Sequence, residues 1–193
     1  MGASNLARQI FLSCALSAVL GCSGTAPDMP QANEIAVPPM SERQRKIEAF
    51  KNLMAENQRL IDELRNRGID VRDTERGVVV NLPDVLFTPG KAELTQDAVT
   101  TVGVIADIVK RAPARRLSVE GHTDDVGTID YNYRLSLARS DRVAQELEVA
   151  GVGRDRISPH ALGETTPIAT NRTEEGRMRN RRVEIIIENQ ADL

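Results

Sequence analysis

The most constraining feature of the sequence is an arginine within the apolar stripe of an expected helix. The helix is expected at 131–150, and the run leading into it, from residue 121 to 139, reads G-H-T-D-D-V-G-T-I-D-Y-N-Y-R-L-S-L-A-R. The residues of the stripe fall four apart and share one face: Leu135, Arg139, Val143 and Leu147. A guanidinium there needs an anionic partner, because an unpaired buried charge is very costly. Asp124, in the preceding loop, is the nearest candidate in the sequence.

A carboxylate and a guanidinium held side by side suit one kind of ligand. Asp124 can take an ammonium group and Arg139 a carboxylate, and these two groups together make an amino acid headgroup. Glu120, His122 and Asp125 lie in the same stretch and raise the alternative of a metal site or a general base. Residues along one strand and its loop point different ways, however, and a hydrolase needs more convergent groups. We therefore expect no enzyme, no catalytic residue, no cofactor and no metal, with His122 as a hydrogen-bonded structural residue.

The other elements alternate short strands with helices. Strands are expected at 69–71, 78–82, 116–120, 157–162 and 182–187. A helix capped by Thr95 follows the second strand, and its buried stripe is Ala98, Val102, Ile105 and Val109. Pro159 places the fourth strand at a sheet edge, because proline cannot donate a ladder hydrogen bond. Residues 163–180 are expected to be a long polar loop.

This order of elements predicts an α/β (α+β) fold. Two main helices would pack on one face of a small mixed sheet, in a sandwich of two layers. Ligand sites in such folds lie in the loops just beyond the strand ends, which is where Asp124 is expected.

Residues 1–21 are typical of a signal peptide and stand apart from the fold. Arg8 supplies a positive start, and the apolar stretch 10–20 is too short for a membrane span of roughly 20 residues. The next residues, Val19-Leu20-Gly21-Cys22, resemble a lipobox, in which the cysteine becomes lipidated. An ordinary signal peptide with an incidental cysteine is the alternative. By resemblance to bacterial lipoproteins, Ser23 in place of aspartate indicates export to the outer membrane.

The number of cysteines is consistent with lipidation. The chain has two, Cys14 and Cys22, and the first lies in the segment that would be removed. The mature protein would then carry no thiol, which suits an oxidising periplasm and excludes zinc sites built from cysteine.

Charge excludes the class of proteins that bind nucleic acid through a global field. The formal net charge is −3. One local cluster is basic and consists of Arg172, Arg177, Arg179, Arg181 and Arg182. The sequence leaves open whether this cluster is a solvated loop or turns an arginine towards a ligand.

Two segments separate Cys22 from the expected domain. Residues 22–40 are a proline-rich linker. Residues 41–76 are a helix, which Ser41 caps and Gly68 ends, followed by a hairpin. The helix has an a/d stripe in which Asn57 is the polar member: Ile47, Phe50, Met54, Asn57, Ile61 and Leu64. It is either an amphipathic helix lying on the domain or a short coiled coil. Residues 41–67 are thus a possible surface for a protein partner or for self-association.

The segment 77–190 resembles a known family. Its motifs are Leu86-Phe87 with Gly90, Gly121-His122-Thr123-Asp124 with Gly127, Asn132, Leu135-Ser136, Ala138-Arg139, Gly163-Glu164, Pro167-Ile168-Ala169, Asn171, Gly176-Arg177 and Asn180-Arg181-Arg182-Val183. In this order they resemble the OmpA-like C-terminal, peptidoglycan-binding domain. With a lipobox in front, the whole chain is similar to the peptidoglycan-associated lipoproteins.

The resemblance implies a function and a set of site residues. Asp124 and Arg139 would bind the diaminopimelate of peptidoglycan stem peptides, and Asn132, Gly90 and Arg181 would line the same mouth. The expected protein is an outer-membrane lipoprotein, lipidated at Cys22 and facing the periplasm, that tethers the envelope to the cell wall. The alternative is an assembly or adaptor lipoprotein of an envelope machine, which wall binding would only localise.

Overall fold

A computed structural model describes residues 40–189, so the lipobox, Cys22 and most of the linker lie outside the described residues. The strands are β1 (Val71–Thr74), β2 (Gly77–Pro83), β3 (Leu117–His122), β4 (Ile157–Gly163) and β5 (Arg182–Glu188). The helices are α1 (Glu42–Asn66), α2 (Gln96–Val109), α3 (Ile129–Val149) and α4 (Glu174–Asn180), with short 3-10 turns at Asp84–Leu86 and Arg154–Arg156.

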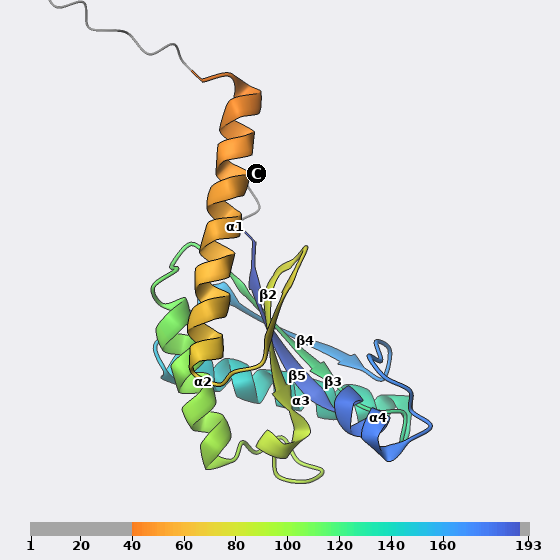
Figure 1. The fold of residues 1–193 in the computed structure, drawn as a ribbon. Coiled ribbons are helices and arrows are strands. Elements are labelled where there is room, and N and C mark those ends of the chain that lie inside the picture. The colour runs from red at the N-terminus through yellow and green to blue at the C-terminus, as the bar shows by residue number, and fades with distance from the viewer. Residues whose placement is uncertain (1–39, 190–193) are drawn as a thin grey trace, which may run out of the picture. The chain divides into compact units, whose positions relative to one another are not determined.

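The five strands form one mixed sheet in the order β1-β2-β5-β3-β4 (Figure 1). The pairs β1–β2, β2–β5 and β5–β3 are antiparallel, and β3–β4 is parallel. A parallel pair needs a crossover, which α3 supplies. The predicted α/β class and mixed sheet are confirmed, and β4, which contains Pro159, lies at the edge as expected.

Alternation along the central strands divides the sheet into an apolar and a polar face, because successive strand residues point to opposite sides. In β5, Val183, Ile185 and Ile187 join the hydrophobic core, whereas Arg182 and Glu184 lie on the other face. The core also contains residues of three helices, among them Leu64 of α1, Ile105 of α2 and Leu147 of α3. The helix layer therefore consists of the two predicted helices and the second half of α1.

The second half of α1 is tied to the sheet by a buried polar cluster. Asn57 is 1% exposed, and its amide donates to Asp73 at 3.3 Å and to Asn189 at 3.1 Å. Its carbonyl accepts a 2.9 Å hydrogen bond from the buried Arg115, which also donates to the Glu188 carbonyl at 3.1 Å. Asn57 is thus used within the chain and not as the polar residue of an intermolecular seam. The segments 41–76 and 77–190 share one core, so their boundary is a division of the sequence only.

The first half of α1 extends beyond the rest of the fold (Figure 1). Its stripe residues are open to solvent: Ile47 is 44% exposed, Phe50 58% and Met54 42%. The expected a/d stripe is therefore split. Its later members are buried by the chain itself, and its earlier members face solvent.

Helix ends follow side-chain caps. Ser41 accepts from the Gln44 amide and Thr95 from the Ala98 amide, each at 3.2 Å, as the sequence predicted. Helix α3 begins earlier than expected because Thr128 caps it by accepting from Tyr131 at 3.2 Å. The expected loop 163–180 was wrong in its last part, since Thr173 caps the short helix α4.

Within residues 40–189, none of the helices has the length and apolar character needed to span a membrane.

Asn57→Leu should lower the free energy of unfolding by about 1–3 kcal/mol, because it removes the hydrogen bond that the buried Arg115 donates to Asn57 and leaves Asp73 and Asn189 without the Asn57 amide. Urea denaturation followed by circular dichroism would measure the change, with the exposed Glu48→Ala as the matched control on the same helix. A coiled-coil seam would give the opposite result, since leucine would strengthen it. Equal or higher stability would contradict the intrachain role of Asn57.

Candidate ligand-binding site

The site is a cleft where β3 ends and β5 begins, at the edge of the sheet that is formed by the ends of the strands. Because these strands are antiparallel, with His122 opposite Arg182, the residues just after β3 and just before β5 meet there. The cleft has a volume of about 410 Å³. The five residues that the sequence analysis selected all line it: Gly90, Asp124, Asn132, Arg139 and Arg181.

Arg139 is buried, as its place in the helix stripe predicted, but its partner is not Asp124. The side chain is 2% exposed, and its Nη2 lies 2.7 Å from Oδ1 of Asp84. Its Nε donates to the Lys91 carbonyl at 3.1 Å, and its Cζ lies 5.0 Å from the centre of the Phe87 ring. The prediction of an Asp124–Arg139 pair was wrong because Asp84, which follows β2, reaches the same edge of the sheet.

Asp124 pairs with a different arginine. Its Oδ2 accepts from Nη1 of Arg181 at 2.6 Å, and its Oδ1 accepts from the Val126 amide at 3.1 Å. The residue is 6% exposed. The carboxylate and the guanidinium still line one cleft, as expected, but each arrives with a counter-ion of its own.

Arg181 connects the two ion pairs. It donates from Nε to Asp84 at 3.0 Å, from Nη1 to Asp124, and from Nη2 to Glu174 at 3.0 Å. Burial by itself would lower the pKa of Arg181, but the hydrogen bonds to Asp124, Glu174 and Asp84 outweigh it and raise the pKa above its ordinary value. The ionised groups of the cleft therefore alternate in sign and balance. Its acids are Asp84, Asp124 and Glu174, and its bases are Arg139, Arg177 and Arg181.

Three buried polar atoms of residues on the cleft have no hydrogen-bond partner in the described part of the chain: Oδ1 of Asp84, which forms only the ion pair with Arg139, and two donors. Neither Nη1 of Arg139 nor the hydroxyl of Thr123 has a hydrogen-bond partner among residues 40–189. Buried donors without partners are uncommon, because each costs about 1–3 kcal/mol. A ligand that offers an acceptor to these atoms would satisfy them. Thr123 is a site residue that the sequence reasoning did not assign, although it precedes Asp124 directly.

Asn132 and Gly90 shape the cleft. The Asn132 side chain is buried and donates to the Asp124 carbonyl at 3.2 Å and to the Glu164 carboxylate at 2.6 Å, so it fixes the loop after β3. Gly90 has a φ of +70°, a conformation that glycine adopts without strain, and it can offer a ligand only main chain.

Gly121 sets the distance between α3 and β3. A Cβ atom at this position would lie 2.1 Å from the carbonyl oxygen of Ser136 on α3. Only glycine lets the helix lie so close to the strand. The close approach carries Arg139, on the same helix, towards the sheet edge that holds Asp84.

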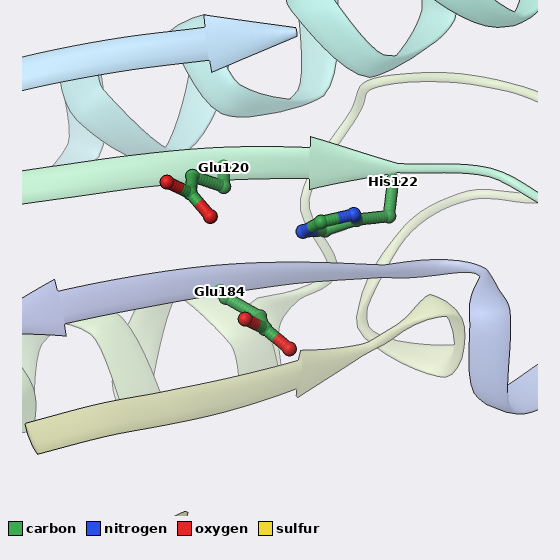
Figure 2. Close-up of side chains that lie close together, drawn as sticks. All are labelled: Glu120, His122 and Glu184. Carbon is green, nitrogen blue, oxygen red and sulfur yellow. The ribbon is translucent and has the colours of Figure 1, made fainter. Parts of the chain in front are cut away.

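A second polar cluster lies on the sheet face opposite the helices. Figure 2 shows Glu120 and His122 of β3 beside Glu184 of β5, and their ligand atoms lie within 4.8 Å of one another. Both carboxylates are already paired, Glu120 with Arg76, and Glu184 with Arg72 and Arg182. These guanidinium groups oppose the binding of a cation.

His122 has the structural role that the sequence predicted. Its Nδ1 is hydrogen-bonded to the Thr166 hydroxyl at 2.9 Å. Burial, and then the charge of Arg182, lower the pKa of His122 to about 4, so the ring is neutral at neutral pH. Desolvation acts on Glu184 in the opposite sense, but its hydrogen bond with Arg182 prevails and lowers its pKa.

Comparison with known proteins places the chain in a family. Residues 86–181 match the OmpA family. The cell wall anchor of the T6SS from Pseudomonas aeruginosa has a similar structure, with a TM-score of 0.58 and 32% identity over 67% of this chain and 94% of that chain. The chain belongs to the OmpA family. The cleft lies within the matched region, apart from Asp84 just before it.

Two lipoproteins are further relatives of this OmpA-family chain. The probable lipoprotein YiaD of Escherichia coli K12 is 38% identical over 130 residues, which make up 67% of this chain and 59% of that protein. The peptidoglycan-associated lipoprotein of Legionella pneumophila is 35% identical over 103 residues, or 53% of this chain and 58% of that protein. The chain thus spans less than two thirds of the length of either relative.

The folded protein should lose stability as the pH falls from about 6.5 to about 4. His122 has a lower pKa in the folded state than its ordinary value of 6.5, so the unfolded chain binds more protons in this range. Its contribution is full above pH 6.5 and is lost towards pH 4, a change of about 3 kcal/mol. Urea denaturation at pH 7 and pH 4.5 would measure it. The His122→Gln variant should show a flatter dependence; an unchanged slope would remove His122 as the cause.

Proposed function

We propose that this chain is an outer-membrane lipoprotein, anchored through Cys22 and facing the periplasm, that binds peptidoglycan non-covalently and tethers the envelope to the cell wall. The observation that carries the proposal is a charge-balanced cleft in which a buried guanidinium keeps one N–H unsatisfied. The printed names of the relatives support it, since one is a peptidoglycan-associated lipoprotein and another a cell wall anchor. The protein acts as a binding module and not as an enzyme.

The ligand group that fits this cleft is the free end of diaminopimelate in a stem peptide. That end carries an ammonium and a carboxylate on one carbon. The ligand carboxylate would accept from Nη1 of Arg139 and from the Thr123 hydroxyl, which would satisfy both groups. The ammonium would bind Asp124. Asn132 and Gly90 would form the wall around it.

The fold should tolerate substitution of Asp124 better than substitution of Arg139. Arg139 contacts Phe87 and Asp84 inside the fold, so its removal leaves Asp84 with Arg181 alone. Asp124 lies in a loop that the Asn132 side chain holds separately. We therefore expect Asp124→Asn to preserve the fold, and we pair it with the conservative Arg139→Lys.

Asp124→Asn and Arg139→Lys should each weaken binding to muropeptides that carry diaminopimelate by about 30-fold or more. Asp124→Asn removes one partner of a buried ligand–protein charge pair, and Arg139→Lys removes the Nη1 donor that the ligand carboxylate would use; we expect either loss to cost roughly 2–5 kcal/mol. Calorimetry would measure the affinities and circular dichroism the fold, with Arg154→Ala as a control that removes only an exposed pair with Glu148. Lysine-type stems lack the side-chain carboxylate and should bind more weakly than diaminopimelate-type stems. Equal affinity for the two would remove Arg139 from the role of carboxylate receptor.

Cys22→Ser should release the protein from the membrane into the periplasm. Stable anchoring takes two acyl chains, and the serine variant would have none. Membrane fractionation with detection of the full chain would measure the change, with Cys14→Ser as the matched control because Cys14 lies in the expected signal peptide. Membrane retention of the Cys22→Ser variant would contradict the lipoprotein assignment.

A second candidate function, an assembly or adaptor role, is favoured by the exposed apolar side chains on the first half of α1. Ile47, Phe50 and Met54 occupy consecutive a and d positions and are open to solvent. In a parallel pairing of two copies, Lys46 at position g would face Lys51 at position e, which disfavours self-association. A partner helix with acidic flanking positions would suit this surface better. Loss of a protein partner on changing Phe50, with wall binding intact, would distinguish this role from tethering alone.

A further inference from the structure

Each carboxylate oxygen of Asp124 already has a hydrogen-bond partner within the chain. One carboxylate oxygen accepts from the Val126 amide and the other from Arg181 at 2.6 Å, and the side chain is 9% exposed. A ligand ammonium that is to bind Asp124 therefore meets a cation already in place. Binding of an ammonium group at Asp124 would therefore be an exchange of one cation for another.

We propose that Arg181 is an internal counter-ion that an incoming ammonium group displaces from Asp124, and that Glu174 and Asp84 retain Arg181 after the exchange. The inference rests on the proposed function and deepens it. Arg181 would then act in the opposite way to Arg139. Arg139 would bind the ligand carboxylate, whereas Arg181 would dissociate from Asp124 when the ligand binds.

The geometry favours displacement over sharing. Two cations within a few ångströms of one carboxylate repel each other, and the repulsion is stronger in a cleft that is partly shielded from water. The small exposed area of Asp124 leaves little room for an ammonium group beside the guanidinium. The hydrogen bond of 2.6 Å also places Nη1 of Arg181 beside Oδ2, the oxygen of Asp124 that has no main-chain donor.

The surroundings of the two arginines differ in the way that the exchange requires. Arg139 is 2% exposed and is fixed on three sides by Asp84, the Lys91 carbonyl and the Phe87 ring. Arg181 is 24% exposed and is bound only by carboxylates.

Two of the three carboxylates around Arg181 would remain to it after the exchange. Glu174 lies on α4, the helix that directly precedes Arg181 in the chain, and its side chain is 60% exposed. The Asp84 side chain is 27% exposed. Arg181 can thus leave Asp124 without becoming an unpaired charge.

If the ligand displaces Arg181 from Asp124, removing the Arg181 side chain should raise the affinity for the ligand. Arg181→Ala removes the competitor for Asp124, so the affinity for any ligand with an ammonium group should rise, on the order of tenfold, the size expected for losing one competing ion pair. The rise should be similar for diaminopimelate-type and lysine-type muropeptides, because both would have to displace the same cation. A ligand-contacting Arg181 would instead give a loss confined to the diaminopimelate type, whose carboxylate it would bind.

Calorimetric titration of the two muropeptides into the full mature chain would test the proposal. The variants are Arg181→Ala and Arg181→Gln, the second of which keeps a polar side chain if alanine disturbs the fold. Arg154→Ala is the control, since Arg154 does not line the cleft and pairs with Glu148 instead. Higher affinity for both muropeptides in the Arg181 variants, with less than about a twofold change in the control, supports the exchange.

A second variant tests the same step from the other side. Glu174→Gln removes a carboxylate that would pair with Arg181 after Arg181 leaves Asp124. The affinity for muropeptides should therefore fall when this change is made in the wild-type chain. It should change little when it is made in the Arg181→Ala variant. Unchanged or lower affinity in Arg181→Ala, while the wild type binds, would overturn the counter-ion role alone. Failure of the wild type to bind either muropeptide would overturn the proposed function and, with it, this inference.

Discussion

The need to compensate one buried guanidinium organises the edge of the sheet. Arg139 lies on a helix face that packs against the core, and Asp84 is the carboxylate that balances it. Asp84 is shared with Arg181, which in turn holds Asp124 and Glu174. The loop after β2, the loop after β3 and the start of β5 are thereby held together by one alternating set of charges. Without Asp84, Arg139 would lose its only carboxylate partner among residues 40–189.

The sheet order explains why these distant segments meet. β5 lies between β2 and β3 and is antiparallel to both, so its first residue is opposite the ends of the other two. Pro83, His122 and Arg182 are therefore at one edge of the sheet. The residues directly after β2, shortly after β3 and directly before β5 each contribute a charge to the cleft: Asp84, Asp124 and Arg181. The same topology puts the cleft at the ends of strands, where ligand sites in open sheets are commonly found.

Local patterns predicted most of the fold and the members of the site, but not their pairing. The spacing of Leu135, Arg139 and Val143 identified a buried arginine, because helix periodicity is a property of neighbouring residues. The choice of Asp84 over Asp124 depends on strand pairing between distant segments, and nothing near Arg139 in the sequence reports it. The hydrogen bond that Arg115 donates to the buried Asn57 was not predicted for the same reason. Helix α4 was missed because its seven residues contain one apolar side chain, Met178, and so carry no apolar period, and only Thr173 marked its start.

The absence of a side chain at Gly121 also bears on how genetic data for this chain would be interpreted. A Cβ there would collide with the Ser136 carbonyl, so any larger residue has to push α3 away from β3. Arg139 would move with the helix, whereas Asp84, which follows β2, and Asp124, which follows β3, would stay with the sheet. A chain altered at position 121 would retain its core residues and lose the register between the two halves of the cleft. A defect at this position would thus mimic the loss of a ligand contact, although residue 121 does not line the cleft.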